Sequence, residues 1–211
     1  MKIRVAVLFG GVSVEHEVSV ISGLQALHAL DNERFDPFPV YLTKDGKWFV
    51  GEGLCDITCY SHLPSLLSHS TEVTLHPKRG ASEFVELNPS FLRTRTFPAD
   101  VFFPVFHGTF GEDGSVQGLF ELMNVAYVGC GVASAAASMD KVLMKEIFRG
   151  NGLPVVPSYW FYSEEYLQNP DEILSAVDRT CNFPCIIKPA LLGSSVGLQV
   201  VRKREEFEEK L

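Results

Sequence analysis

The first apolar run and the turn that ends it constrain the fold more than any other stretch of this chain. Residues 3–9, IRVAVLF, are apolar except for Arg4, which predicts a short strand buried within a sheet. A glycine pair ends the run, and the charged cluster Glu15–Glu17 follows at the start of a predicted helix. A buried strand that turns through glycines into a helix is typical of an α/β domain.

Strand and helix patterns alternate as far as Gly131. The predicted elements are a helix at 115–124 and further strands at 35–43, 99–108 and 125–129. This alternation predicts a mostly parallel, Rossmann-like α/β sheet, in which residues 52–98 form an insertion. Because ligands bind at the carboxyl ends of strands in such sheets, we expect the loops after Phe9 and Phe106 to share one crevice.

The helix after the glycine pair is predicted to pack on this sheet. Ser13 is its expected N-cap, because serine side chains accept hydrogen bonds from the first free N–H groups. Val18, Ile21 and Leu24 recur at helical spacing, so we expect them to form its buried stripe.

The second half of the chain changes character and predicts a separate domain. A single helix is expected over 133–152, followed by helical turns that Pro170 interrupts. Strands are predicted at 185–190 and 198–203. The last eight residues, REEFEEKL, start a helix inside which the chain stops, so we expect it to be part of a longer protein.

Composition narrows the class of protein. The net charge is −8 and the pI is about 5.2, which argues against a general nucleic-acid binder. The start, MKIRVAVLFGG, lacks the pattern of a signal peptide. No apolar stretch approaches the roughly 20 residues that span a bilayer. We therefore expect a cytoplasmic protein that binds neither nucleic acid nor membrane.

The five cysteines offer one metal hypothesis. Cys55 and Cys59 are separated by three residues, and so are Cys181 and Cys185. Zinc knuckles more often separate their cysteines by two residues on a tight turn. We favour the alternative that these cysteines are small buried residues with free thiols, and we expect no metal site within the chain.

The stretch from Lys188 to Gly197, KPALLGSSVG, is the sharpest local signal. A lysine on a strand precedes a loop that contains two glycines and Ser194. The loop N–H groups, the serine hydroxyls and the ammonium group can all donate to phosphate oxygens. The P-loop pattern is absent. The alternative is a hairpin turn with a solvated lysine.

A second loop, HGTFGEDGSVQG, begins with His107 at a predicted strand end. The imidazole is a candidate donor to a substrate carboxylate, and the alternative is a histidine that serves the loop itself. Glu112 and Asp113 lie close to a helix start, where carboxylates accept N–H hydrogen bonds. We predict that this acidic pair is structural.

Four phrases in a fixed order identify a family resemblance. They are GGVSVEHEVS, HGTFGEDGSVQG, GVASAAASMDK and IIKPALLGSSVG. Together they resemble the D-alanine–D-alanine ligases of the ATP-grasp superfamily, from about Lys2 to the end of the chain and most weakly over 52–98. The resemblance implies an N-terminal pre-ATP-grasp domain at 1–131, followed at 132–211 by the first α+β lobe of an ATP-grasp domain, truncated at its C-terminus.

The resemblance also implies a reaction and a substrate site. Ligases of this family transfer the γ-phosphate of ATP to one D-alanine, and the amine of a second D-alanine attacks the acylphosphate, giving a dipeptide for peptidoglycan. Glu15 matches the acid that holds the first substrate's ammonium group, and His107 matches the histidine beside its carboxyl group. Val18 is assigned to the same site.

The nucleotide and catalytic positions follow from the same resemblance. Lys141 and Lys188 match the lysines that contact ATP phosphates, with Gly193 and Ser195 in the same binding loop. Ser194 matches a serine that hydrogen-bonds with the family's substrate-binding acid. We expect Glu15, His107 and Ser194 to line one cleft.

Several features are expected beyond Leu211. They include the ligands for Mg²⁺ or Mn²⁺ and most of the adenine pocket, so we expect the 211-residue chain alone to be inactive. Three alternatives stay open: a D-alanine–D-lactate ligase, another ATP-grasp ligase, and a non-catalytic module that binds an amino acid or a nucleotide. A homodimer is also left open.

Overall fold

The chain folds into two compact units. The computed structural model describes residues 1–89 and 94–211. The first unit is Met1–Ala136 and the second is Ala137–Leu211, against an expected division at 131/132.

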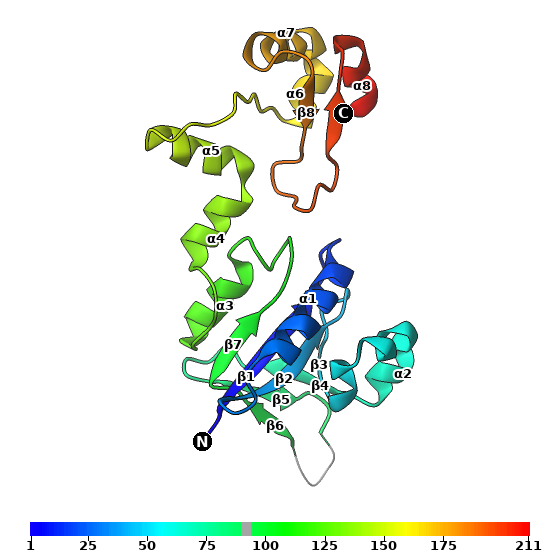
Figure 1. Ribbon diagram of the computed structural model, residues 1–211, viewed down its shortest axis with the longest axis vertical. Helices are drawn as coiled ribbons and strands as arrows, with labels where there is room; N and C mark the ends of the chain where they lie inside the picture. Colours follow the sequence, from blue (N-terminus) through cyan, green and yellow to red (C-terminus); the bar gives the residue numbers. More distant parts are fainter. Residues whose placement is uncertain (90–93) are drawn as a thin grey trace. The chain divides into compact units, whose positions relative to one another are not determined.

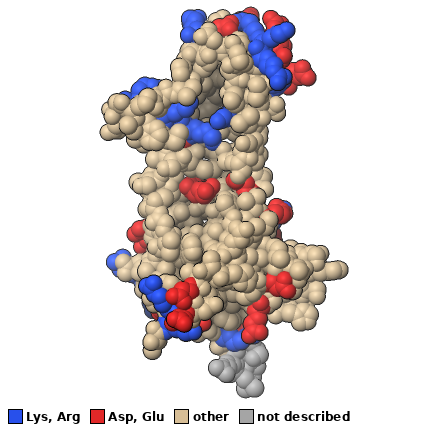
Figure 2. Space-filling view, in the orientation of Figure 1, with Lys and Arg blue, Asp and Glu red and all other residues tan. Residues whose placement is uncertain are grey.

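Among the described residues, no helix is both long and apolar enough to cross a membrane. On the face seen in Figure 2, acidic and basic side chains are interspersed over the first unit.

One mixed sheet organises the first unit (Figure 1). Its described strands lie in the order β6-β5-β4-β3-β2-β1-β7. Their bounds are β1 Ile3–Gly10, β2 Phe35–Leu42, β3 Trp48–Val50, β4 Thr71–Leu75, β5 Glu83–Glu86, β6 Thr96–Pro98 and β7 Val101–Pro104. The α/β fold class is confirmed.

The prediction that the sheet is mostly parallel is wrong. Only β1 pairs in parallel, with β2 on one side and β7 on the other. The other four pairs, from β2–β3 to β5–β6, are antiparallel. The reason is the length of the connections, because a short turn such as that at 43–47 can join only antiparallel neighbours. The segment 52–98, expected as an insertion, supplies three of these strands, and its residues 90–93 lie outside the described part.

Helices cover both faces of the sheet around β1. On one face, α1 (His16–Ala29) packs on alternate β1 residues together with η1 (Glu52–Cys55), η2 (Ile57–His62) and α2 (Leu63–Ser68). On the other face, α3 (Ser115–Met123) packs through Val116 and Phe120 against Ala6 and Leu8. The apolar character of residues 5–9 in β1 is therefore explained by burial on both sides.

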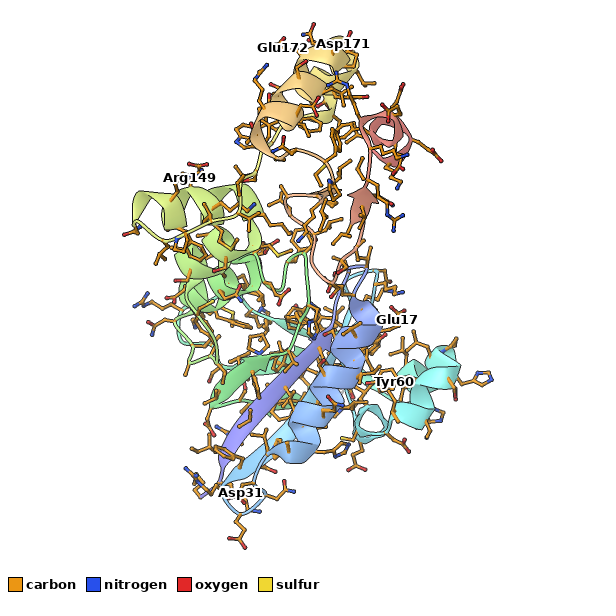
Figure 3. All side chains as sticks on the ribbon, turned by 45° about the horizontal axis from the view of Figure 1, so that its top comes forward. Glu17, Asp31, Tyr60, Arg149, Asp171 and Glu172 are labelled. Atoms are coloured by element: carbon orange, nitrogen blue, oxygen red, sulfur yellow. The ribbon has the colours of Figure 1, made fainter. Side chains whose placement is uncertain are left out.

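The expected stripe of α1 is only partly correct. Leu24 is buried, but Val18 is 46% exposed and Ile21 is 51% exposed. Ser13 is not the N-cap, because the helix begins at His16 with Glu15 in that position. The buried side of α1 is instead made of His16, Ser19, Val20, Gly23, Leu24 and Leu27. Figure 3 marks the two ends of this helix with Glu17 and, just beyond the last turn, Asp31.

The predicted strand at 125–129 is also wrong. Its only ladder contact in the described chain is an isolated parallel bridge between Tyr127 and Phe102. The N–H of Phe102 donates to Ala126, and the N–H of Val128 donates to the carbonyl of Phe102. The segment touches the edge of β7 for too short a distance to form a strand.

The second unit contains a hairpin and short helices. The hairpin is antiparallel, between β8 (Cys185–Ile187) and β9 (Gln199–Val201). The helices are α5 (Lys141–Gly150), α6 (Ser163–Gln168), α7 (Pro170–Thr180) and α8 (Phe207–Lys210), with the short turn η3 (Arg204–Glu206) before α8. A small core of Tyr166, Ile173, Val177, Val201 and Phe207 joins α6, α7 and α8 to the hairpin.

The single helix expected over 133–152 is two helices. α4 (Val132–Met139) ends before Asp140, and α5 begins after it. The Asp140 carboxylate accepts hydrogen bonds from the N–H groups of Val142 and Leu143, at 2.8 and 3.1 Å. The backbone of Asp140 is extended, as that of an N-cap residue should be.

Removing this cap should destabilise the second unit. We expect Asp140→Ala to lower the free energy of unfolding by about 1 kcal/mol, because two N–H groups at the start of α5 lose their acceptor. Urea unfolding followed by circular dichroism measures this loss. Asp140→Asn keeps an acceptor oxygen and should retain most of the stability. An equal loss in both variants would contradict capping as the cause.

Candidate functional site

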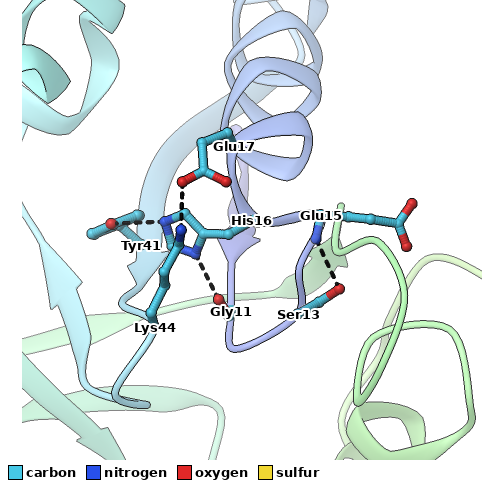
Figure 4. A network of polar contacts seen from close by, with 7 residues as sticks. All are labelled: Gly11, Ser13, Glu15, His16, Glu17, Tyr41 and Lys44. Atoms are coloured by element: carbon cyan, nitrogen blue, oxygen red, sulfur yellow. Dashed lines mark hydrogen bonds and ion pairs between the residues drawn. The ribbon is translucent and has the colours of Figure 1, made fainter. Parts of the chain in front are cut away.

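The glycine turn after β1 is held by a buried histidine (Figure 4). His16 Nδ1 lies 2.6 Å from the carbonyl oxygen of Gly11, and its Nε2 lies 3.0 Å from the Tyr41 hydroxyl. Since a carbonyl only accepts, Nδ1 carries a proton and donates to Gly11. Burial raises the pKa of Tyr41 to about 12, so its hydroxyl stays protonated and can donate to Nε2. His16 is therefore a structural pin between the turn and β2.

The side chain of Glu15 points in a different direction from that of His16 (Figure 4). Its side chain points away from His16 and Tyr41 (Figure 4) and is only 5% exposed. Its N–H donates to Ser13 Oγ at 3.1 Å. A Cβ atom on Gly108 would lie 2.5 Å from Glu15 Oε2 and 2.5 Å from Ser13 Oγ. The Glu15 carboxylate thus lies against the loop that carries His107.

The structure therefore brings two predicted substrate residues to one edge of the sheet. Glu15 follows β1 and His107 follows β7, and these strands are parallel neighbours. His107 is half-buried, and its Nε2 lies 3.0 Å from Ser22 Oγ on α1. Val18 is on the same helix with 46% of its surface exposed. Ser194 belongs to the second unit, so the expectation that it shares a cleft with Glu15 and His107 stays a prediction.

The acidic pair in the His107 loop is structural, as predicted. Glu112 accepts from the N–H of Gly108 at 2.7 Å. Asp113 accepts from the N–H groups of Phe110 and Ser115 at 2.8 and 3.0 Å. Burial alone would raise the pKa of Asp113, but these hydrogen bonds outweigh it and lower the pKa. Both carboxylates shape the loop around Gly108.

Glu17 has a different role from Glu15 although it is only two residues away. It forms an ion pair with Lys44 at 2.5 Å, with side chains that are 68% and 60% exposed. An ion pair this exposed contributes about 0–1 kcal/mol. Glu17 is a surface group at the start of α1.

A second candidate site lies within the second unit. A pocket of about 100 Å³ is lined by Lys141, Lys188, Pro189, Leu192, Gly193, Ser194, Ser195, Val196 and Leu198. Since a water occupies about 30 Å³ in the liquid, this volume suits a group the size of one phosphate rather than a whole nucleotide. All five residues predicted to bind ATP lie on its wall.

Charge and backbone geometry make this pocket suitable for an anion. Burial and, after it, repulsion from Lys188 lower the pKa of Lys141. An anion placed between the two ammonium groups would relieve that repulsion. Ser194 and Ser195 adopt positive φ angles of 45° and 61°, which are uncommon outside glycine. Such local strain occurs often in loops that bind ligands.

Lys141 also holds the loop in place. Its Nζ donates to the carbonyls of Ala190 and Leu192, at 3.2 and 2.5 Å, and its N–H donates to Ala190 at 3.1 Å. The start of α5 is therefore tied to the loop between β8 and β9. This contact gives Lys141 a loop-shaping role that the sequence did not predict.

The apolar groove and the cysteines provide less support for a binding site. An open apolar groove of about 890 Å³ lies between α1 and Cys55–Ile57, and it is lined by none of the predicted site residues. All five cysteines are free thiols. Within residues 1–89 and 94–211, no group of three or more His, Cys, Asp or Glu side chains is placed to hold a metal ion.

Comparison with known protein families shows to which family this chain is related. The family described as "D-ala D-ala ligase N-terminus" matches residues 4–130, which is more than half of the chain. The chain belongs to the D-alanine–D-alanine ligase family. The family described as "D-ala D-ala ligase C-terminus" matches residues 147–211.

Individual relatives agree with this family. A D-alanine–D-alanine ligase of Natranaerobius thermophilus is 41% identical over 208 residues, covering 98% of this chain and 55% of its own. Among solved structures, the VanG D-Ala:D-Ser ligase from Enterococcus faecalis is 29% identical with a TM-score of 0.80, over 100% of this chain and 58% of its own. The D-alanine–D-alanine ligase from Coxiella burnetii is 30% identical with a TM-score of 0.76, over 99% and 57%. The chain thus spans a little over half the length of these relatives.

Sequence reasoning about function missed two residues beside the substrate positions. Ser13 contacts the backbone at Glu15, and Ser22 contacts His107. The sequence did contain a signal for Ser22, because Ser19 and Ser22 are three residues apart and lie on one side of a helix. The apolar stripe predicted for this helix does not include that polar side.

Proposed function

We propose that the whole protein is an ATP-dependent ligase that joins two D-alanine molecules through an acylphosphate intermediate, for peptidoglycan synthesis in the cytoplasm. The observation that supports this best is the placement of the buried Glu15 carboxylate against the His107 loop. A carboxylate and an imidazole at one strand edge complement the ammonium and carboxylate groups of an amino acid.

In this proposal, Glu15 binds the ammonium group of the first D-alanine, while His107 donates to its carboxyl group. An ion pair is stronger in a site with little water, because screening is weak there. Val18, exposed on the first turn of α1, supplies apolar contact beside them. Binding both ends of the zwitterion orients the carboxylate for phosphoryl transfer.

The loop between β8 and β9 binds the phosphates of ATP. Lys188 and Lys141 neutralise charge, and the hydroxyls of Ser194 and Ser195 and the backbone at Gly193 donate to phosphate oxygens. Phosphoryl transfer depends mainly on such positioning and charge neutralisation. Mg²⁺ or Mn²⁺, when bound, would supply additional positive charge to offset the negative charge of the phosphates.

Replacing Lys188 tests the nucleotide site. We expect Lys188→Met in the whole protein to weaken ATP binding about 10- to 100-fold, because one charge-assisted hydrogen bond to a phosphate is lost. Isothermal titration calorimetry with ATP and Mg²⁺ measures the affinity. Lys203→Met removes an exposed lysine of the same unit and should leave the affinity unchanged. Equal affinities in the two variants would return Lys188 to a solvated surface role.

The choice of second substrate defines the alternative function. The VanG protein, a D-Ala:D-Ser ligase, matches the full length of this chain. D-serine is therefore one alternative second substrate, and D-lactate, which the sequence leaves open, is the other. Phosphate release with ATP, Mg²⁺ and D-alanine alone tests the proposal, and addition of D-serine or D-lactate tests the alternatives. Binding of D-alanine or nucleotide without any phosphate release would instead favour a non-catalytic module.

A further inference from the structure

Two serines of α1 contact the exit of β7, and they do so differently. Ser19 is fully buried, and its hydroxyl donates to the carbonyl of Val105 at 2.7 Å while it accepts from the N–H of Gly10. Both of its partners are backbone groups, so Ser19 is part of the scaffold. Ser22, one turn later, contacts a side chain instead, the imidazole of His107 at 3.0 Å.

We propose that Ser22 is a positioning residue that sets the rotation of the His107 ring and so presents Nδ1 to the substrate carboxylate. This proposal rests on the proposed ligase function. The ring is half-buried on a loop, and the contact to Ser22 joins it to the same helix that begins at Glu15. The two ends of the bound amino acid would then be held from one rigid element.

The chemistry of the contact suits either charge state of His107. In the proposed arrangement, the Ser22 hydroxyl donates to Nε2 of the neutral ring, which requires the proton to be on Nδ1. In the protonated ring, Nε2–H donates to Ser22 Oγ, and Nδ1 again carries a proton. Nδ1–H is thus a donor toward a carboxylate in both states. Without Ser22, the ring can rotate and the tautomer is no longer selected.

Kinetics of the whole protein test the positioning role. We expect Ser22→Ala to lower kcat/KM for D-alanine about 3- to 10-fold, mainly through KM, since one ordinary hydrogen bond is lost. The KM for ATP should not change. Ser22→Thr keeps the hydroxyl and should restore the wild-type value. In a His107→Ala background, Ser22→Ala should have no further effect, and an additive loss would overturn the proposal.

Nitrogen-15 NMR of the imidazole tests the contact without relying on activity. We expect the His107 nitrogen shifts of the wild type to indicate that Nδ1 carries a proton. In Ser22→Ala, we expect both nitrogen shifts to move toward values averaged over the two tautomers. Ser19→Ala should lower thermal stability and leave the His107 shifts in place. Unchanged shifts in Ser22→Ala would overturn the proposal. If the wild type shows the expected shifts but releases no phosphate with D-alanine, the ligase function fails while the Ser22 contact stands.

Discussion

Alanine at Gly10 is expected to destabilise the first unit by about 3–5 kcal/mol, enough to unfold a domain of ordinary stability. Two effects combine at this position. Gly10 has φ = +93°, which an alanine adopts only with strain. An added Cβ would also lie 2.2 Å from the carbonyl oxygen of Leu42 and 3.2 Å from His16. The β1–β2 pair and the His16 pin would both have to move.

Gly46 provides a control that separates the cost of backbone strain from the cost of a steric clash. Gly46 has a similar φ of +82°, but a Cβ added there would meet no atom within 4 Å. Gly46→Ala therefore carries the strain alone and should cost about 1 kcal/mol. Urea unfolding of both variants in a Trp160→Phe background, with Trp48 fluorescence as the signal, reports on the first unit. Equal midpoints for the two variants would show that the close approach to Leu42 is unimportant.

The features that could be predicted from sequence are those with local causes. The run at 3–9 is a strand because it is apolar apart from Arg4, and the glycines at its end take the positive φ angles that a sharp turn requires. Glu112 and Asp113 were correctly predicted as structural because carboxylates near a helix start have nearby N–H groups to accept from. Each of these interactions spans only a few residues of chain.

The errors came from contacts between distant segments. Hydrophobic periodicity cannot find the buried side of α1, because His16 and Ser19 are polar and are buried through hydrogen bonds to Gly11, Tyr41 and Val105. The antiparallel strands β4 to β6 follow from hairpins in a segment whose sequence pattern is weak. Ser22 faces His107 across 85 positions of sequence, which no local pattern reports.

In the proposed function, the substrate site depends most on one carboxylate, and its exposed neighbour provides the matched control. Glu15 is 5% exposed, whereas Glu17 belongs to an ion pair on the surface. Glutamine in place of Glu15 keeps the size of the side chain and the bond from its backbone N–H to Ser13, and it removes the negative charge. The same change at Glu17 removes an equal charge from the same helix end.

In the whole protein, we expect Glu15→Gln to lower kcat/KM for D-alanine by about 100-fold or more. Removing one partner of a desolvated charge pair typically costs about 2–5 kcal/mol, and each 1.4 kcal/mol is about tenfold. Glu17→Gln should change kcat/KM less than about threefold, because its ion pair is weak and solvated. Phosphate release measured against D-alanine concentration gives both values, and circular dichroism checks that each variant is folded. If Glu15→Gln and Glu17→Gln lose activity equally, the loss arises from the general charge at the helix start, and Glu15 does not bind the substrate ammonium group.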